Sequence, residues 1–147
     1  MPDTHDEQPE NHDEDGGGRD GLTVLGRGPM VPQHRIECFP VAAEVVRIEL
    51  STDELICRCP VTGQTDLYRA SIVYRPAGRA IETKSLKLYL ATFQGHAGMF
   101  AEHLTDRIAG DVIEASGAEA VEVTLVQHVR GGIATTVTAV RGQPLSR

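Results

Sequence analysis

E-T-K-S-L-K-L-Y, residues 82–89, is the stretch that decides the fold of this chain of 147 residues. From Ser85 onward, apolar residues recur at spacings of three and four, which is the period of one buried helical face. These apolar residues are Leu86, Tyr89, Leu90 and Phe93. Before Ser85 the chain reads as extended, so Glu82 and Lys84 are expected to share one side. Lys87 falls off the apolar face and is available to solvent or a phosphate, although an ordinary strand-to-helix junction with solvated lysines has the same pattern.

Charge is distributed unevenly along the chain, whose formal net charge is -7. Residues 1–20 hold eight acidic side chains and only Arg19 as a base, so this segment accounts for the whole negative charge. It also carries Gly16, Gly17 and Gly18 and has no apolar periodicity. Such a segment cannot bury enough surface to offset the entropy lost on ordering.

The domain organisation follows from this asymmetry. We expect a disordered acidic leader over residues 1–34, one folded domain over 35–142 and a loose tail over 143–147. His5 and His12 lie among the acids of the leader and suggest metal capture, but a solvated leader is the simpler interpretation. No metal site is predicted elsewhere.

Composition also excludes several classes of protein. No apolar run is long enough to span a membrane, and the N-terminus lacks the basic-then-apolar plan of a secretion signal. The three cysteines, Cys38, Cys57 and Cys59, are an odd number without the spacing of a disulfide framework. The body carries no Lys/Arg cluster, which argues against direct nucleic-acid binding. The sequence therefore predicts a cytoplasmic protein.

Two strands are predicted before the central stretch. Val46, Ile48 and Leu50 alternate with polar residues, and the segment 67–74 is rich in strand-forming residues. The segment 57–66 between them contains turn-forming Pro and Gly residues and is expected to be an exposed loop.

The loop carries the residues best suited to chemistry. Cys57-Arg58-Cys59 is a poor metal site because it offers two sulfurs and no companion pair, and two small buried residues are an alternative interpretation. A neighbouring Arg58 favours a thiolate, and Asp66 can return across the turn as a proton carrier. The pattern leaves open which of the two cysteines is reactive.

Two helices and a hairpin complete the predicted elements. The first helix is expected to end near Gly95, since Gly95 and Gly98 bracket a short break, and the second to run over residues 99–116 with Gly117 as its stop. In the second helix Phe100, Leu104, Ile108 and Val112 lie four apart along one side. Strands over 120–129 and 133–140 are joined by a Gly-Gly turn. Strands, two helices and a hairpin predict an α+β domain.

Three motifs resemble one known family. C-P-x-T-G-Q-x-D from Cys59 to Asp66, the octet 82–89 and R-G-G-I at 130–133 are similar to motifs of the NADPH-dependent nitrile reductases that act on 7-cyano-7-deazaguanine, the QueF family. Within the octet only Thr83 departs from the family pattern. The resemblance covers roughly residues 36–142.

The resemblance implies a tunnelling fold (T-fold), in which an antiparallel sheet carries two helices on one face. It further implies a homo-oligomer of stacked rings with active sites between subunits. The implied reaction converts the nitrile to 7-aminomethyl-7-deazaguanine, a precursor of queuosine in tRNA. The chain has no G-x-G-x-x-G after a strand, so a Rossmann site is not the route to the cofactor.

Residue roles are also implied by the resemblance. Cys59 is the covalent nucleophile and Asp66 the general acid, whereas Cys57 is structural. The residues implied to bind substrate are Ile81, Glu82, Thr83, Ala101 and Glu102. The residues implied to bind NADPH are Thr83, Lys84, Lys87, Arg130 and Gly131.

One position departs from the family. The family has Phe-His-Glu where this chain has Phe100-Ala101-Glu102, so the histidine is replaced by Ala101. His96 or His103 could supply an imidazole from elsewhere. Two alternatives therefore remain: a relative that adds ammonia to the same thioimide, and a non-catalytic deazapurine-binding ring protein.

Overall fold

The computed structural model describes residues 21–25 and 31–145. Its elements in chain order are β1 (Cys38–Pro40), β2 (Ile48–Arg58), β3 (Thr65–Arg75), β4 (Arg79–Ile81), α1 (Thr83–Ala91), the 3-10 helix η1 (Thr92–Gly95), α2 (Ala101–Ser116), β5 (Ala120–Arg130) and β6 (Ile133–Gly142). Among the described residues, neither helix is both long and apolar enough to cross a membrane.

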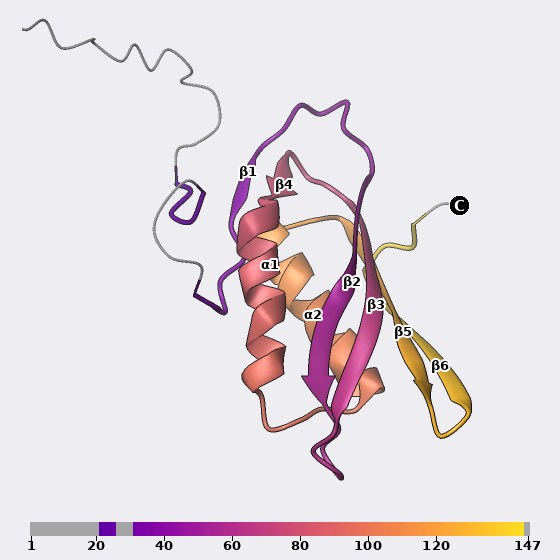
Figure 1. The fold of residues 1–147 in the computed structure, drawn as a ribbon. Helices are drawn as coiled ribbons and strands as arrows, with labels where there is room; N and C mark the ends of the chain where they lie inside the picture. Colours follow the sequence, from indigo (N-terminus) through magenta and orange to yellow (C-terminus); the bar gives the residue numbers. More distant parts are fainter. Residues whose placement is uncertain (1–20, 26–30, 146–147) are drawn as a thin grey trace, which may run out of the picture.

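The strands form one large and one small antiparallel sheet. The large sheet has the order β2-β3-β5-β6, and β1 pairs with β4 beside it (Figure 1). Tyr74 on β3 lies between Ile48 of β2 and Val121 of β5, which fixes the register at one end of the sheet. The predicted α+β class is confirmed.

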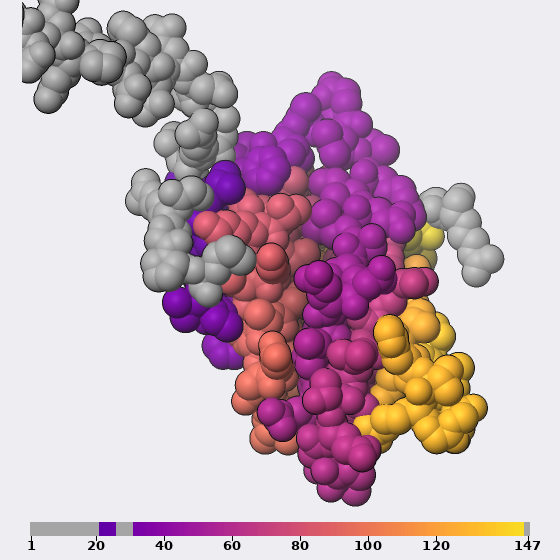
Figure 2. All heavy atoms as spheres, viewed as in Figure 1, coloured from indigo at the N-terminus to yellow at the C-terminus, as the bar shows by residue number. Residues whose placement is uncertain are grey.

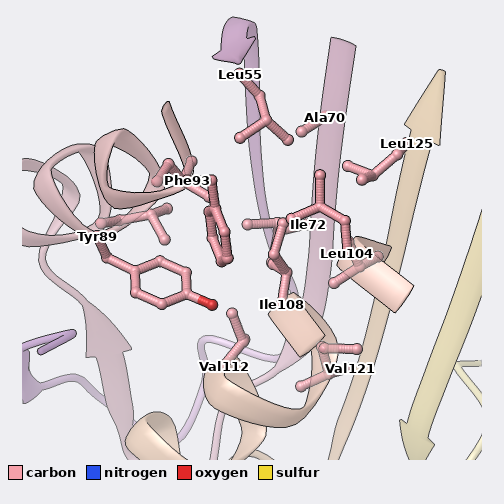
Figure 3. Close-up of a cluster of buried hydrophobic side chains, with 14 of the residues drawn as sticks. Leu55, Ala70, Ile72, Tyr89, Phe93, Leu104, Ile108, Val112, Val121 and Leu125 are labelled. Atoms are coloured by element: carbon pink, nitrogen blue, oxygen red, sulfur yellow. The ribbon is translucent and has the colours of Figure 1, made fainter. Parts of the chain in front are cut away.

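Both helices pack on the same face of the large sheet. The apolar side chains of α2 meet those of the central strands, and the aromatic side chains of α1 and η1 fill the space beside them (Figure 3). Leu104, Ile108 and Val112 of α2 are fully buried, as their spacing of four predicts, and each such burial contributes about 1.5–3 kcal/mol. Phe100, the first residue of this predicted stripe, is instead 49% exposed because it is the N-cap of α2.

Helix α1 begins earlier than expected. It starts at Thr83 with Glu82 as its N-cap, so Glu82 and Lys84 do not share one side of an extended segment. The two carboxylate oxygens of Glu82 accept the backbone N–H groups of Lys84 at 2.7 Å and Ser85 at 2.8 Å. A carboxylate at this position satisfies two free N–H groups and complements the helix dipole, which explains the early start.

The predicted leader lies mostly outside the described residues. Its described parts are 21–25 and 31–34, and in the first of these Leu22 and Val24 are buried against the domain. The Thr23 N–H donates to the Glu37 carboxylate at 2.8 Å, and Lys84 Nζ donates to the Val24 carbonyl at 2.9 Å. These contacts tie the segment to the start of α1.

The ends of the later elements follow the sequence closely. Gly117 ends α2 in the left-handed conformation, and its N–H donates to the Ile113 carbonyl at 2.9 Å. Gly131 and Gly132 both have positive φ and form the two-residue turn between β5 and β6. The predicted loose tail is described only to residue 145.

Candidate active site

Cys59 lies on a tight loop between β2 and β3. Its N–H donates to the Gln64 carbonyl at 2.8 Å, and its own carbonyl accepts the Gly63 N–H at 2.9 Å. Gly63 has a φ of 70°, which a residue with a side chain rarely adopts. The loop is therefore closed by backbone hydrogen bonds, and it holds the Cys59 thiol in one place.

Asp66 lies on β3 and not on the loop, which corrects the sequence-based expectation. It pairs in register with Cys57 of β2, and it is 5% exposed. Both residues belong to the buried, helix-facing side of the sheet. The sheet itself therefore positions the acid, and Cys57 is part of the core.

Arg130 reaches this end of the sheet from β5. A register irregularity between Gln127 and Arg130 changes the direction of the strand just before the hairpin turn, as β-bulges do. The Arg130 guanidinium forms an ion pair with the Asp66 carboxylate and also lies close enough to the Cys59 sulfur to lower the pKa of that thiol. The Arg130 side chain is 41% exposed, so further donors face solvent.

The surroundings of Cys59 favour the thiolate. The hydrogen bond from Arg130 is the largest cause, followed by those from the Thr62 hydroxyl and the N–H groups of Thr62 and Val61, and together they lower the pKa of Cys59 to about 6. Burial raises the pKa of Cys57 above its ordinary value. Of the two cysteines, Cys59 therefore has the surroundings that favour a thiolate.

The start of α2 is brought to the same place. The Met99 N–H donates to the Arg58 carbonyl at 3.0 Å. A Cβ on Gly98 would lie 2.8 Å from the Pro60 backbone, so only glycine permits this approach. The contact places Ala101 and Glu102 beside the Cys59 loop, and the Glu102 side chain is exposed.

The two histidines considered as replacements do not enter this arrangement. His96 and His103 are both exposed, and His103 stacks edge-on against Phe100 with ring centroids 6.0 Å apart. Neither ring forms a hydrogen bond with Cys59 or Asp66.

Glu82, Thr83, Lys84 and Ile81 lie at the opposite end of the sheet. The Ile81 N–H donates to the Tyr74 hydroxyl at 2.9 Å, which ties this group to the far end of β3. Asp66 and Tyr74 are eight residues apart on that strand, or about 26 Å at the usual rise per residue. One chain therefore does not bring the two sets of predicted residues together.

A groove runs between the two ends. It has a volume of about 690 Å³ and follows the seam between α1 and β2 (Figure 2). Thr83 and Lys87 line it from α1, and both are exposed. Its floor is apolar and its other rim carries Glu49 and Glu54. Thr83 and Lys87 are thus the predicted cofactor residues that line this groove.

Sequence reasoning missed two residues that contribute to the Cys59 end of the molecule. Gly98 lies in the predicted break between the helices. Its close approach to Pro60 cannot be predicted locally because it depends on a contact between distant segments. Tyr68 was read as one of several strand residues, yet its buried hydroxyl has no partner among the described residues. No local sequence pattern indicates the close approach of Gly98 or the unpaired hydroxyl of Tyr68. Thr62, by contrast, is part of the cysteine motif.

The chain is similar to several known proteins. A family model described as QueF-like protein matches residues 66–145. A Frankia casuarinae protein named NADPH-dependent 7-cyano-7-deazaguanine reductase is 42% identical over 80% of this chain and 94% of its own length. Proteins of the same name from Anaeromyxobacter sp. and Syntrophus aciditrophicus are 40% and 39% identical, over 78% and 84% of this chain and 95% and 88% of theirs.

A solved structure supports the fold. The apo form of the archaeosine synthase QueF-Like superposes with a TM-score of 0.63, covering 68% of this chain and 97% of that one at 22% identity. The predicted tunnelling fold is confirmed by this similarity. With the family match and the identity to the reductases, it shows that the chain belongs to the QueF-like protein family.

Proposed function

We propose that this protein reduces the nitrile of 7-cyano-7-deazaguanine to an aminomethyl group, with NADPH as the reductant. The observation that carries the proposal is the contact of one guanidinium, that of Arg130, with both the Cys59 sulfur and the Asp66 carboxylate. A thiolate beside a buried carboxyl group is the pair that covalent attack on a nitrile needs. The names of the reductases at about 40% identity support the same substrate.

The first step uses Cys59 and Asp66. The Cys59 thiolate forms a carbon–sulfur bond with the nitrile carbon, one carbon–nitrogen π bond breaks, and the nitrogen takes the proton of Asp66, which enters this step as the protonated acid and leaves it as the carboxylate. The product is a thioimide on Cys59. Two hydrides and two further protons then complete the conversion to the amine and free the thiolate.

We propose that three cations hold the phosphates of the cofactor. Lys87 and Arg130 are exposed, and Lys84 uses one of its three N–H donors on the Val24 carbonyl. Thr83 lies on the rim of the groove beside Lys87, and Gly131 follows Arg130 in the hairpin turn. Bound NADPH would supply the hydrides, and these five residues would orient it.

Two carboxylates are assigned to the purine-like base. Glu102 is exposed beside the Cys59 loop, so its two oxygens are available to a pair of N–H donors. Glu82 already accepts two backbone N–H groups, and each oxygen retains a second lone pair for ligand. Ile81, Thr83 and Ala101 complete the proposed substrate-binding set.

The separation of these groups favours an assembly of several copies. Because about 26 Å of β3 separates Asp66 from the Glu82 end, we propose that the Cys59 end of one chain meets the Glu82 end of another. The edge strands β2 and β6 leave backbone groups available for such pairing. We further propose a cytoplasmic location, in keeping with the free thiols of Cys38, Cys57 and Cys59.

Mass spectrometry of the intact protein tests the reaction. The protein is incubated with 7-cyano-7-deazaguanine, with and without NADPH, and both the adduct and the free product are followed. We expect an adduct on Cys59 that disappears when NADPH is added, with release of the aminomethyl compound. An adduct that persists with NADPH but clears with ammonium would instead show ammonia transfer, and the absence of any adduct would contradict the proposal.

A further inference from the structure

Tyr68 is the one residue whose buried side-chain polar atom has no hydrogen-bond partner within residues 21–25 and 31–145. It is 1% exposed. A buried hydroxyl without a partner is costly, and folded proteins rarely keep one without a reason. The other buried tyrosines are satisfied, because the Tyr74 hydroxyl accepts the Ile81 N–H at 2.9 Å and the Tyr89 hydroxyl donates to Asp111 at 2.7 Å.

The position of Tyr68 places it among the proposed catalytic groups. It lies two residues after Asp66 on β3, on the same helix-facing side of the sheet. Across the sheet it pairs with Leu55 of β2 and with Gln127 of β5, where the irregularity that turns Arg130 begins. Ala101, at the start of α2 and in the same core cluster, has no side-chain polar atom to offer it.

The charged groups around the Tyr68 hydroxyl come from every element packed there. They are Cys57 on β2, Asp66 on β3, Glu102 on α2 and Arg130 on β5. Burial is the largest influence and raises the pKa of Tyr68 well above its ordinary value, and the charges of Asp66, Cys57 and Glu102 raise it further while Arg130 lowers it. The phenol therefore keeps its proton and can act only as a hydrogen-bond donor or acceptor.

We propose that Tyr68 is a positioning residue that donates a hydrogen bond to Asp66 when Asp66 gives up its proton. The inference rests on the proposed function. Asp66 passes its proton to the nitrile nitrogen and becomes a carboxylate, and the Tyr68 O–H stabilises that charge without transferring its own proton. In the free protein Asp66 is paired with Arg130, and the Tyr68 hydroxyl has no partner in the described part of the chain.

The substitution Tyr68→Phe tests this. Loss of the hydroxyl should slow thioimide formation roughly tenfold, the effect of losing one hydrogen bond to a charged group. The dependence of that rate on pH should also change, because the lost donor is proposed to stabilise the group that gives up the proton. The Tm should stay the same or rise, since a hydroxyl with no partner in the resting protein is removed.

The matched control is Tyr89→Phe, which removes the hydroxyl paired with Asp111, away from this cluster. It should lower the Tm and leave the rate profile unchanged. The second test is a double variant, in which Tyr68→Phe added to Asp66→Asn should cause no further slowing.

The outcomes separate the two proposals. If the wild-type protein forms the Cys59 adduct, and Tyr68→Phe forms it at the wild-type rate with an unchanged pH profile, the role of Tyr68 is refuted while the proposed function stands. The same holds if the two substitutions slow the reaction additively. If the wild-type protein forms no adduct, the proposed function fails and the inference fails with it.

Discussion

The two ends of β3 hold the proposed ligand groups by different means. At the Cys59 end, the charged side chains are held by one cation, because Arg130 lies beside both the Cys59 thiol and the Asp66 carboxylate. At the Glu82 end, the carboxylate is held by the backbone of a helix start and not by a cation. We propose that the first end serves chemistry, because a thiol and a carboxyl group can exchange protons, and that the second serves rigid recognition. Neither end alone contains both functions.

The largest expected effect is at the Cys59 end. Cys59→Ala should abolish the covalent adduct with 7-cyano-7-deazaguanine, since no other thiol shares the contact with Arg130 in the part of the chain that is described. Cys57→Ala is the matched control and should retain the adduct, because Cys57 is a fully buried core residue. Intact-protein mass spectrometry measures both. An adduct of wild-type amount on Cys59→Ala would refute the assignment of the nucleophile.

Mixing variants of the two ends tests whether they combine across chains. Cys59→Ala lacks the nucleophile, and Glu82→Gln should turn over poorly at low substrate concentration. If the proteins are unfolded together and refolded in equal amounts, random assembly gives roughly one quarter of sites with both intact ends. We expect turnover to recover toward that fraction of the wild-type rate. Recovery no greater than the sum of the separate variants would show that each chain uses only its own residues.

Much of the fold and of the Cys59 end followed from local sequence patterns. The spacing of four along α2 predicted its buried face, and Gly117 predicted where it ends. The two glycines after Arg130 predicted the hairpin, because a two-residue turn needs positive φ at both positions. These features depend on neighbours in the sequence, which is why they could be predicted without a structure.

The remaining features depend on contacts between distant segments. Asp66 was expected on a loop, but strand pairing with Cys57 continues up to it and buries it. Glu82 was read as part of a strand, although capping of α1 gives its carboxylate two hydrogen bonds. Residues 21–25 of the predicted leader also depend on distant contacts. Leu22 and Val24 are buried against the domain, and the Thr23 N–H donates to Glu37.

A smaller effect is expected from Arg130→Gln, which weakens the Cys59 end without removing a reacting atom. With Arg130 present the thiolate forms above a pH of about 6, and without it the Cys59 pKa should move up toward the ordinary thiol value. The thiolate is the nucleophile, so the pH at which alkylation by iodoacetamide reaches half its maximum rate should rise. Arg141→Gln, which removes an exposed ion pair with Asp106, is the control and should leave this pH unchanged. An unshifted profile for Arg130→Gln would show that the N–H groups of the loop are enough to lower the pKa of Cys59 without Arg130.

The smallest effect is expected at the Glu82 end, on stability. Glu82→Ala removes the N-cap of α1, and loss of a cap costs about 1 kcal/mol, or roughly 4–8 °C in Tm for a domain of this size. Thr83→Ala, at the next residue, changes an exposed side chain that caps nothing and is the control. Thermal unfolding of the two variants should therefore differ, even though both lie beside the groove. Equal melting temperatures for Glu82→Ala and Thr83→Ala would mean that the Glu82 carboxylate does not stabilise the helix. Its proposed role would then be ligand binding alone.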